Sequence, residues 1–470
     1  MRRVAGVAVL AVTVIFAAHP GRISDQDARL KGAFRRTEQN GWIYVHLQGT
    51  PAQIGFQHGY LLAPEIEDLL KVTREVLTHE NHKNWAFFRD AAQNVFLPKV
   101  EAQYRDEMQG IVEGLNARGV SMDLTDVTVL NASIEMTPYY VDWYDAQHGI
   151  HHKRKPTPEH CSAFVATGSY TKDGRIAIAH NNWSEYNDGE RWNIMFDIAP
   201  AAGHHILMDG LPGVIDSADD FGENDAGIVI TETTIGYFSA FDPNGIPEFV
   251  RARKAMQYAT SIDEFASIMK EGNNGAYANT WLVADINRNE IGHLELGLKN
   301  VTFDKKNDGY FVGSNFPENP ELMKEEAPDF PANDMSISSN ARHVRWKQLM
   351  EENKGKIDIA MAQKFLADHY DSFEHRDDAP SERTLDGHID LSARGSEPWE
   401  PPYGIAGAVQ NKTTDADMAS KMELSAAMGH ACGLNFNAAE HLRKHPQFRW
   451  EKNILRNMNS YPWTTFAATK

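Results

Sequence analysis

Cys161 lies at the boundary between a polar stretch and a strand-like region, and it combines the features that an N-terminal nucleophile needs. Such a nucleophile is a Cys, Ser or Thr whose own α-amino group, which titrates at about pH 8, acts as its base. Cys161 begins a strand-like run, which fixes its position, and directly follows a stretch that is easily cut. These features predict self-cleavage between His160 and Cys161. The ordinary alternative is a buried structural cysteine.

The stretch before Cys161, residues 145–160, is a polar linker with two prolines and a basic cluster. It separates two regions of different character. Residues 19–144 read as mainly helical after a strand-like stretch at 41–50, whereas residues 161–470 hold short strand-like runs between Gly, Asn and Asp turns. Later helices are predicted at about 247–270, 340–369 and 414–429. This order favours an α+β layered domain over a doubly wound sheet.

From Cys161 onward, the sequence resembles the phospholipase B-like family of N-terminal-nucleophile hydrolases. The run CSAFVATGSYTKDGRIAIAHNNW is similar to that family's nucleophile hairpin. Three later stretches resemble family motifs in the same order: ETTIG (232–236), YANTW (277–281) and FRW (448–450). The N-terminal GTPAQIGFQHGYLL resembles the related penicillin-acyltransferase-like cysteine hydrolases. The resemblance implies a four-layer αββα sandwich of two packed antiparallel sheets, with a mainly helical N-terminal segment.

The resemblance also implies roles for individual residues. Cys161 becomes the catalytic thiol and the site of self-cleavage, and His180 becomes an orienting or electrostatic neighbour. Asn279 becomes the oxyanion-hole amide, a kind of donor that is worth about 3 kcal/mol. Supporting or substrate-binding roles fall to Trp183, Thr233, Thr234 and Arg342, with Arg345 as the second choice for the arginine.

Each neighbour has an ordinary structural alternative. The alternative for His180 is a strand residue whose ring is hydrogen-bonded, for Trp183 a core side chain, and for Asn279 a turn residue. For Thr233 and Thr234 it is an ordinary strand residue, and for Arg342 a residue on a helix surface.

The formal net charge of −19 and the pI of about 5.5 indicate a surface that repels phosphate backbones, so no nucleic-acid partner is expected. Residues 1–18 read as a secretory signal, with Arg2 and Arg3 before an apolar run of about 15 residues. An uncleaved N-terminal anchor is the alternative. After signal removal no integral membrane segment is expected, and the location is secreted, periplasmic or, in a eukaryote, a lysosome-like lumen.

No metal or cofactor is expected from the sequence. It lacks a P-loop, a G-x-G-x-x-G fingerprint and a G-x-S-x-G elbow. The linker holds several histidines, but a loop without supporting hydrogen bonds is a poor metal site. The two cysteines, Cys161 and Cys432, could instead form a disulfide in an exported non-enzyme.

These residues together predict an exported, self-processing hydrolase with a Cys161 acyl-enzyme and a small-molecule acyl or lipid substrate. The resemblance implies phospholipid esters. An amidase or acyltransferase on N-acyl substrates is the alternative. The assigned residues act on the acyl carbonyl, so they do not distinguish an alcohol from an amine leaving group. An inactive binding protein on the same fold is the alternative from another class. The oligomeric state stays open.

Overall fold

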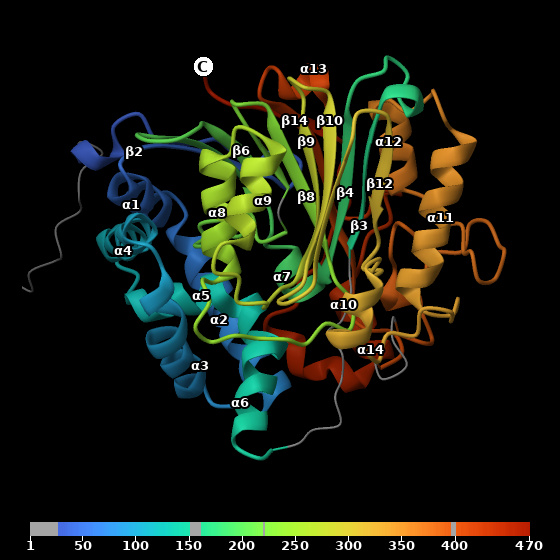
Figure 1. Cartoon of the computed structure of the whole chain (residues 1–470). Helices are drawn as coiled ribbons and strands as arrows, with labels where there is room; N and C mark the ends of the chain where they lie inside the picture. The colour runs from blue at the N-terminus through green and yellow to red at the C-terminus, as the bar shows by residue number, and fades with distance from the viewer. Residues whose placement is uncertain (1–26, 151–160, 220, 396–400) are drawn as a thin grey trace, which may run out of the picture.

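Two β-sheets form the centre of the computed structural model, which describes residues 27–150, 161–219, 221–395 and 401–470 (Figure 1). Neighbouring strands in both sheets are antiparallel, except for the parallel pair β2 and β5. The nine-stranded sheet runs in the order β1 (Phe34–Arg35), β2 (Ile43–Gly49), β5 (Ile194–Pro200), β6 (Ile206–Gly210), β7 (Gly222–Asn224), β8 (Ile228–Thr234), β9 (Asn279–Asp285), β10 (Glu290–Leu296) and β11 (Val301–Lys306). The six-stranded sheet runs in the order β12 (Gly309–Gly313), β3 (Cys161–Thr167), β4 (Ala177–Glu185), β13 (Ala406–Asp415), β14 (Glu423–Met428) and β15 (Thr464–Ala467).

Helices cover the outer face of each sheet (Figure 1). The layer on the nine-stranded sheet comprises α1 (Pro51–Leu61), α2 (Ala63–Asn81), α3 (Trp85–Ala91), α4 (Ala102–Ala117), α5 (Leu124–Glu135), α6 (Val141–Gln147), α8 (Glu248–Tyr258) and α9 (Ile262–Lys270). The layer on the six-stranded sheet comprises α11 (Ser338–Glu352) and α12 (Ile359–Leu366). Four short helices lie at the sheet ends: α7 (Tyr186–Gly189), α10 (Pro320–Glu325), α13 (Ala416–Ala419) and α14 (Ala438–Lys444).

The side chains of β3 show why the layers stack in this order. Ala163 and Val165 pack between the two sheets, whereas Phe164 and Ala166 pack against α11 and α12. All seven residues of the strand are buried, as a strand covered on both faces requires. The αββα sandwich that the resemblance implies is therefore confirmed.

The region before residue 161 is not only helical, because it supplies β1 and β2 to the nine-stranded sheet. The strand-like stretch at 41–50 is confirmed as β2. Residues 145–147, which the sequence assigned to the linker, belong to α6 instead, and residues 151–160 of the expected linker lie outside the described residues. Residues 1–18 and the cleavage residue His160 lie outside the described residues.

The helix predicted at about 414–429 is wrong. This stretch contains the end of β13, the four-residue α13 and the whole of β14. Its alanines and methionines favour helix in isolation. However, Leu424, Ala426 and Met428 alternate into the space between the sheets, and β14 pairs with both β13 and β15. Sheet pairing therefore overrides the local preference. The helices predicted at 247–270 and 340–369 are present as α8, α9, α11 and α12.

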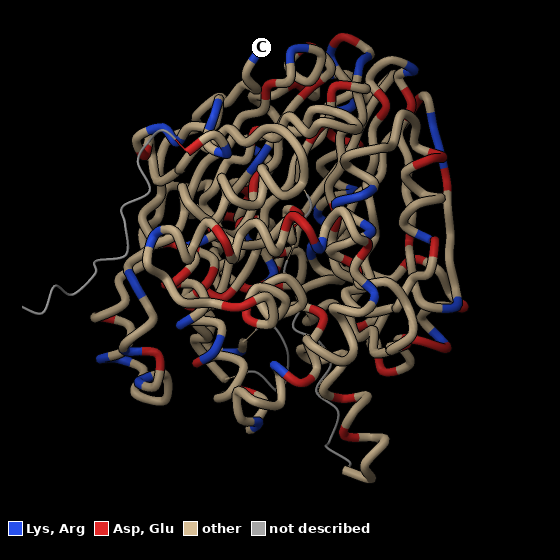
Figure 2. Tube along the Cα trace, turned by 90° about the vertical axis from the view of Figure 1, so that its left-hand side faces the viewer, with Lys and Arg blue, Asp and Glu red and all other residues tan. Residues whose placement is uncertain are grey.

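The charges are distributed rather than gathered. Figure 2 shows basic and acidic residues interspersed along the trace. In the described part of the chain, no helix combines the length and the apolar character needed to cross a bilayer.

Candidate active site

The site residues gather where several strands meet at one edge of the sandwich. β3 begins there and β4 ends there, because the two strands are antiparallel and Cys161 lies opposite Asn182. β8 ends at the same edge, opposite the start of β9. β12 also ends there, since Gly313 pairs with Ala163. In Figure 1 this is the lower edge, where α7 follows β4.

The backbone of Cys161 is held on both sides. Its N–H donates to Asn315 Oδ1 at 3.1 Å, and its carbonyl oxygen accepts from the Arg342 guanidinium. The same guanidinium donates to Asn315 Oδ1 at 2.9 Å and to the Ser162 hydroxyl at 3.1 Å. Arg342 and Asn315 thus fix the nitrogen and the carbonyl that flank the thiol.

The thiol of Cys161 lies among buried polar groups. Its Sγ is 4.0 Å from Asn182 Oδ1, and the reactive atoms of Cys161, His180 and Glu232 all lie within 4.8 Å of one another. Burial, with a smaller effect from the Glu232 charge, raises the pKa of the Cys161 thiol well above its usual value. Burial also raises the pKa of Glu232. The Cys161 thiol in this structure is therefore neutral near pH 7.

His180 is fully buried between the sheets, and in the described structure neither ring nitrogen has a hydrogen-bond partner. Burial, helped by the charge of Lys412, lowers the pKa of His180 well below its usual value. The Lys412 ammonium is balanced by Asp219 and by Asp209, whose Oδ2 lies 3.1 Å from Nζ. His180 is thus a neutral ring without a hydrogen bond in the described structure, and its Nδ1 lies 4.0 Å from Asp219 Oδ2.

Asn279, Thr233 and Thr234 lie at the junction of β8 and β9. Asn279 begins β9 directly opposite Thr234, whose carbonyl accepts from Asn315 Nδ2 at 2.8 Å. The buried amide of Asn279 has no hydrogen-bond partner among the described residues. The Thr233 hydroxyl likewise has none there, and its side chain lies against Gly313. A chain of contacts through Thr234 and Asn315 thus joins Asn279 to the backbone of Cys161.

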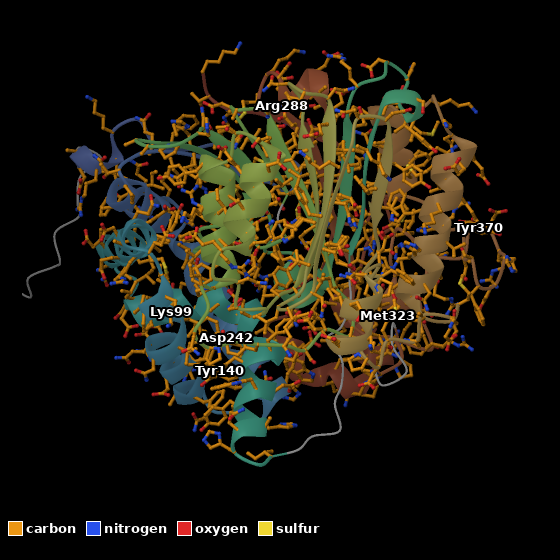
Figure 3. All side chains as sticks on the ribbon, in the orientation of Figure 1. Lys99, Tyr140, Asp242, Arg288, Met323 and Tyr370 are labelled. Carbon is orange, nitrogen blue, oxygen red and sulfur yellow. The ribbon has the colours of Figure 1, made fainter. Side chains whose placement is uncertain are left out.

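Arg342 and Arg345, the two candidate arginines, lie in different surroundings, and Arg342 is the one that contacts Trp183. The Arg342 guanidinium stacks on the Trp183 ring at 4.5 Å, and the Trp183 indole N–H donates to the Leu385 carbonyl at 3.3 Å. Arg345 instead pairs with Asp368 and stacks on Tyr370, which lies on the outer side of α11 (Figure 3). Of the two arginines, only Arg342 contacts the backbone of Cys161.

The sequence reasoning missed Asn315 and Asn182. Asn182 could have been found, because it lies two residues after His180 and so shares its face of a strand. Asn315 follows β12 in an irregular turn with φ of 64°, which asparagine tolerates. Only the pairing of β12 with β3 brings it to Cys161.

The two cysteines lie in different surroundings, and both are free. Cys161 is buried, whereas Cys432 is exposed and has its Sγ 3.6 Å from His388 Nε2. The described structure therefore contains no Cys161–Cys432 disulfide.

Comparison with known proteins identifies relatives over most of the chain. The profile of the family described as "Phospholipase B" matches residues 62–464. An uncharacterized protein from Archaeoglobus fulgidus is 25% identical over 318 residues, covering 62% of this chain and 48% of that protein. The putative phospholipase B-like 2 of Mus musculus is 24% identical over 343 residues, covering 63% of this chain and 55% of that protein. The matched region thus spans about half the length of these relatives.

Among solved structures, penicillin V acylase from Agrobacterium tumefaciens matches with a TM-score of 0.33 and 11% identity. That match covers 57% of this chain and 83% of the acylase.

Proposed function

Because this chain belongs to the phospholipase B family, we propose that it is an exported hydrolase that activates itself by cleavage before Cys161 and then cleaves acyl ester bonds of phospholipids. One observation carries the proposal: the nitrogen, the carbonyl and the thiol of Cys161 are each held or surrounded by buried polar groups at the start of a strand. A structural cysteine needs none of these contacts.

Self-cleavage follows from the position of the thiol. The Cys161 sulfur attacks the carbonyl carbon of His160, and the bond between that carbon and the Cys161 nitrogen breaks. The proton of the thiol passes to this nitrogen, which becomes an α-amine, while the acyl group of His160 is left on sulfur as a thioester. Water then hydrolyses the thioester, which frees the thiol and leaves a carboxylate on His160.

The new α-amine then serves the catalytic cycle. It takes the thiol proton, the thiolate attacks the acyl carbonyl of the substrate, and the amine returns the proton to the departing alcohol. Asn315 Oδ1, which accepts from this nitrogen in the uncut chain, orients the amine. Water finally releases the fatty acid from the Cys161 thioester. The buried amides of Asn182 Nδ2 and Asn279 are the donors available for the oxyanion.

The uncut chain is closed around the nucleophile. Cys161 is only 4% exposed, and two cavities of about 370 and 470 Å³ are lined by other residues. Access of a substrate acyl chain to the thiol therefore requires that the groups covering Cys161 move, a step for which the proposed cleavage gives an opportunity.

The first test follows the cleavage itself. On a denaturing gel, the exported wild-type chain is expected to run as two fragments, and N-terminal sequencing of the larger one should begin at Cys161. Cys161→Ala removes the nucleophile and should stay whole. A wild-type chain that stays intact at both acidic and neutral pH contradicts the proposal.

The second test identifies the substrate bond. The processed enzyme is incubated with mixed phospholipids and, separately, with N-acyl amides, and the released fatty acids are measured by mass spectrometry. Release from phospholipids supports the proposal, and release from amides alone supports the amidase alternative. If a processed enzyme releases neither, the inactive binding protein becomes the better reading.

A further inference from the structure

A second cluster of reactive side chains lies apart from Cys161, where the long segment between α12 and β13 meets the turn after β14. It consists of His369, Asp386, His388 and Cys432. One ligand atom from each residue lies within 4.8 Å of all the others. These residues are spread over 64 positions of the sequence, so only the tertiary fold brings them together.

The separations within this cluster match those around a tetrahedral metal ion. His369 Nε2 lies 3.2 Å from His388 Nε2 and 3.3 Å from Asp386 Oδ2. Cys432 Sγ lies 3.6 Å from His388 Nε2, which is 3.7 Å from Asp386 Oδ2. A tetrahedral zinc ion with ordinary bond lengths places two nitrogens about 3.4 Å apart and a sulfur and a nitrogen about 3.6 Å apart.

Hydrogen bonds alone leave this arrangement unexplained. His388 Nε2 faces another imidazole nitrogen, a carboxylate oxygen and a sulfur at the same time. A neutral ring nitrogen carries either one proton or one lone pair, so it satisfies only one of these neighbours. A cation at the centre satisfies all four groups at once.

The groups behind the cluster orient its members as they do in metal sites. Asp386 Oδ2 accepts from the Cys432 N–H at 2.9 Å, and Asp386 Oδ1 lies 3.3 Å from His430 Nδ1. His430 stacks on His388 with ring centroids 3.8 Å apart, and its Nε2 lies 3.0 Å from the Tyr186 hydroxyl. The cluster is thus backed by a buried polar network, while exposed Cys432 leaves it accessible from solvent.

We propose that His369, Asp386, His388 and Cys432 bind one structural Zn²⁺ ion. Two imidazoles, a thiolate and a carboxylate suit zinc, and their two negative charges balance the ion. Four protein ligands close the coordination sphere, which marks the site as structural rather than catalytic. Binding releases the proton of the Cys432 thiol.

The ion stabilises a segment that has little regular structure of its own. Between the end of α12 and the start of β13, the described residues include only one short 3₁₀ turn, Ile389–Leu391. This segment also supports the nucleophile site, because the Leu385 carbonyl accepts from the Trp183 indole and from the Asn181 amide at 2.8 Å. Gly387 lies directly against the Trp183 ring, where a Cβ atom would approach ring carbons to 2.2 Å. The zinc ion therefore holds in place the backbone of residues 385–387, which packs against Trp183.

The metal content of the full chain tests this proposal without reference to activity. The protein is produced in zinc-supplemented medium, gel-filtered and analysed by elemental mass spectrometry, and about one zinc per chain is expected. Cys432→Ser and His388→Gln should lose most of it. Two controls alter the two other clusters that share no residue with this one: His205→Gln, whose residue pairs with Asp197, and Cys161→Ala. Both controls should keep the zinc.

Cobalt gives a second readout, which in the wild-type protein is independent of how any variant folds. Wild-type protein stripped of metal and titrated with Co²⁺ should show tetrahedral visible bands and a near-ultraviolet sulfur-to-cobalt band. Cys432→Ser should lose the sulfur band. The proposal is overturned if the wild type binds neither metal, or if Cys161→Ala loses the ion while Cys432→Ser keeps it. Chelation of the wild type should also lower its melting temperature.

Discussion

At the scale of single residues, the side chain of Arg342 links four groups of the candidate site. Its guanidinium contacts the Cys161 carbonyl, the Ser162 hydroxyl and Asn315 Oδ1, and it also stacks on Trp183. Arginine suits this position because its planar fork presents several donors in fixed directions. A lysine offers the same charge from a single point, so it cannot hold the carbonyl and the amide together.

Arg342→Lys is therefore expected to slow self-cleavage by about tenfold to a hundredfold, the effect of losing one or two charged hydrogen bonds. The rate is measured on denaturing gels after the freshly folded chain is transferred to the processing buffer. Arg345→Lys is the matched control, three residues along the same helix, because Arg345 pairs with Asp368 instead. Equal cleavage rates for the two variants would remove Arg342 from the mechanism.

At the scale of elements, the packing of α1 against α4 depends on four glycines. A Cβ atom at Gly55, Gly59, Gly110 or Gly114 would approach backbone atoms of the other helix to between 1.8 and 2.5 Å. The two helices therefore lie in backbone contact, and α1 follows directly after β2. This contact fixes the helical layer on the nine-stranded sheet.

Gly114→Ala is expected to lower the free energy of unfolding by about 1–3 kcal/mol, because its methyl group would meet the Phe56 carbonyl oxygen at 2.2 Å. Chemical denaturation followed by circular dichroism measures the change. Asn116→Ala, on the exposed face of α4, is the control and should leave stability unchanged or slightly raised. If Gly114→Ala behaves like this control, the two helices are not in backbone contact.

At the scale of the whole molecule, the proposed cut divides one fold rather than two domains. β2 precedes the cut, yet it lies inside the nine-stranded sheet and pairs with β5, which follows the cut. Asp197 on β5 joins the two parts: it accepts from the Tyr44 hydroxyl at 2.6 Å and lies 2.7 Å from His46 Nδ1. It also accepts from the Thr469 hydroxyl at 2.6 Å, near the C-terminus. The two fragments should therefore stay associated.

The cleaved protein is thus expected to elute from gel filtration as one species at neutral pH and to separate only under denaturing conditions. Although burial opposes it, hydrogen bonds from His205, His46, Thr469 and Tyr44 hold the pKa of Asp197 below its usual range. The stabilisation is present above the unfolded pKa of about 3.9 and is lost as the pH falls further.

Asp197→Asn tests this junction. The variant should release the N-terminal fragment at lower urea concentration than the wild type at pH 7, with a smaller difference between pH 7 and pH 3. A small fragment that leaves the wild type without denaturant at pH 7 contradicts the expectation of one undivided fold.

The sequence alone determined the features that depend on neighbouring residues. The strand runs that became β3, with Cys161 as its first residue, and β4 are confirmed, and so are the helices α8, α9, α11 and α12. Local patterns carry these features because strand and helix periodicities repeat within a few residues. The same local patterns failed at 414–429, where pairing of β14 with two strands decided the outcome.

Only the tertiary structure decided which distant residues meet. Asn315 reaches Cys161 because β12 pairs with β3, and the choice of Arg342 over Arg345 depends on which side of α11 faces β3. The cluster of His369, Asp386, His388 and Cys432 has no recognisable spacing in the sequence. Such contacts arise from long-range packing, which leaves no periodic trace in the chain, so a sequence with no expected metal can still fold into a metal site.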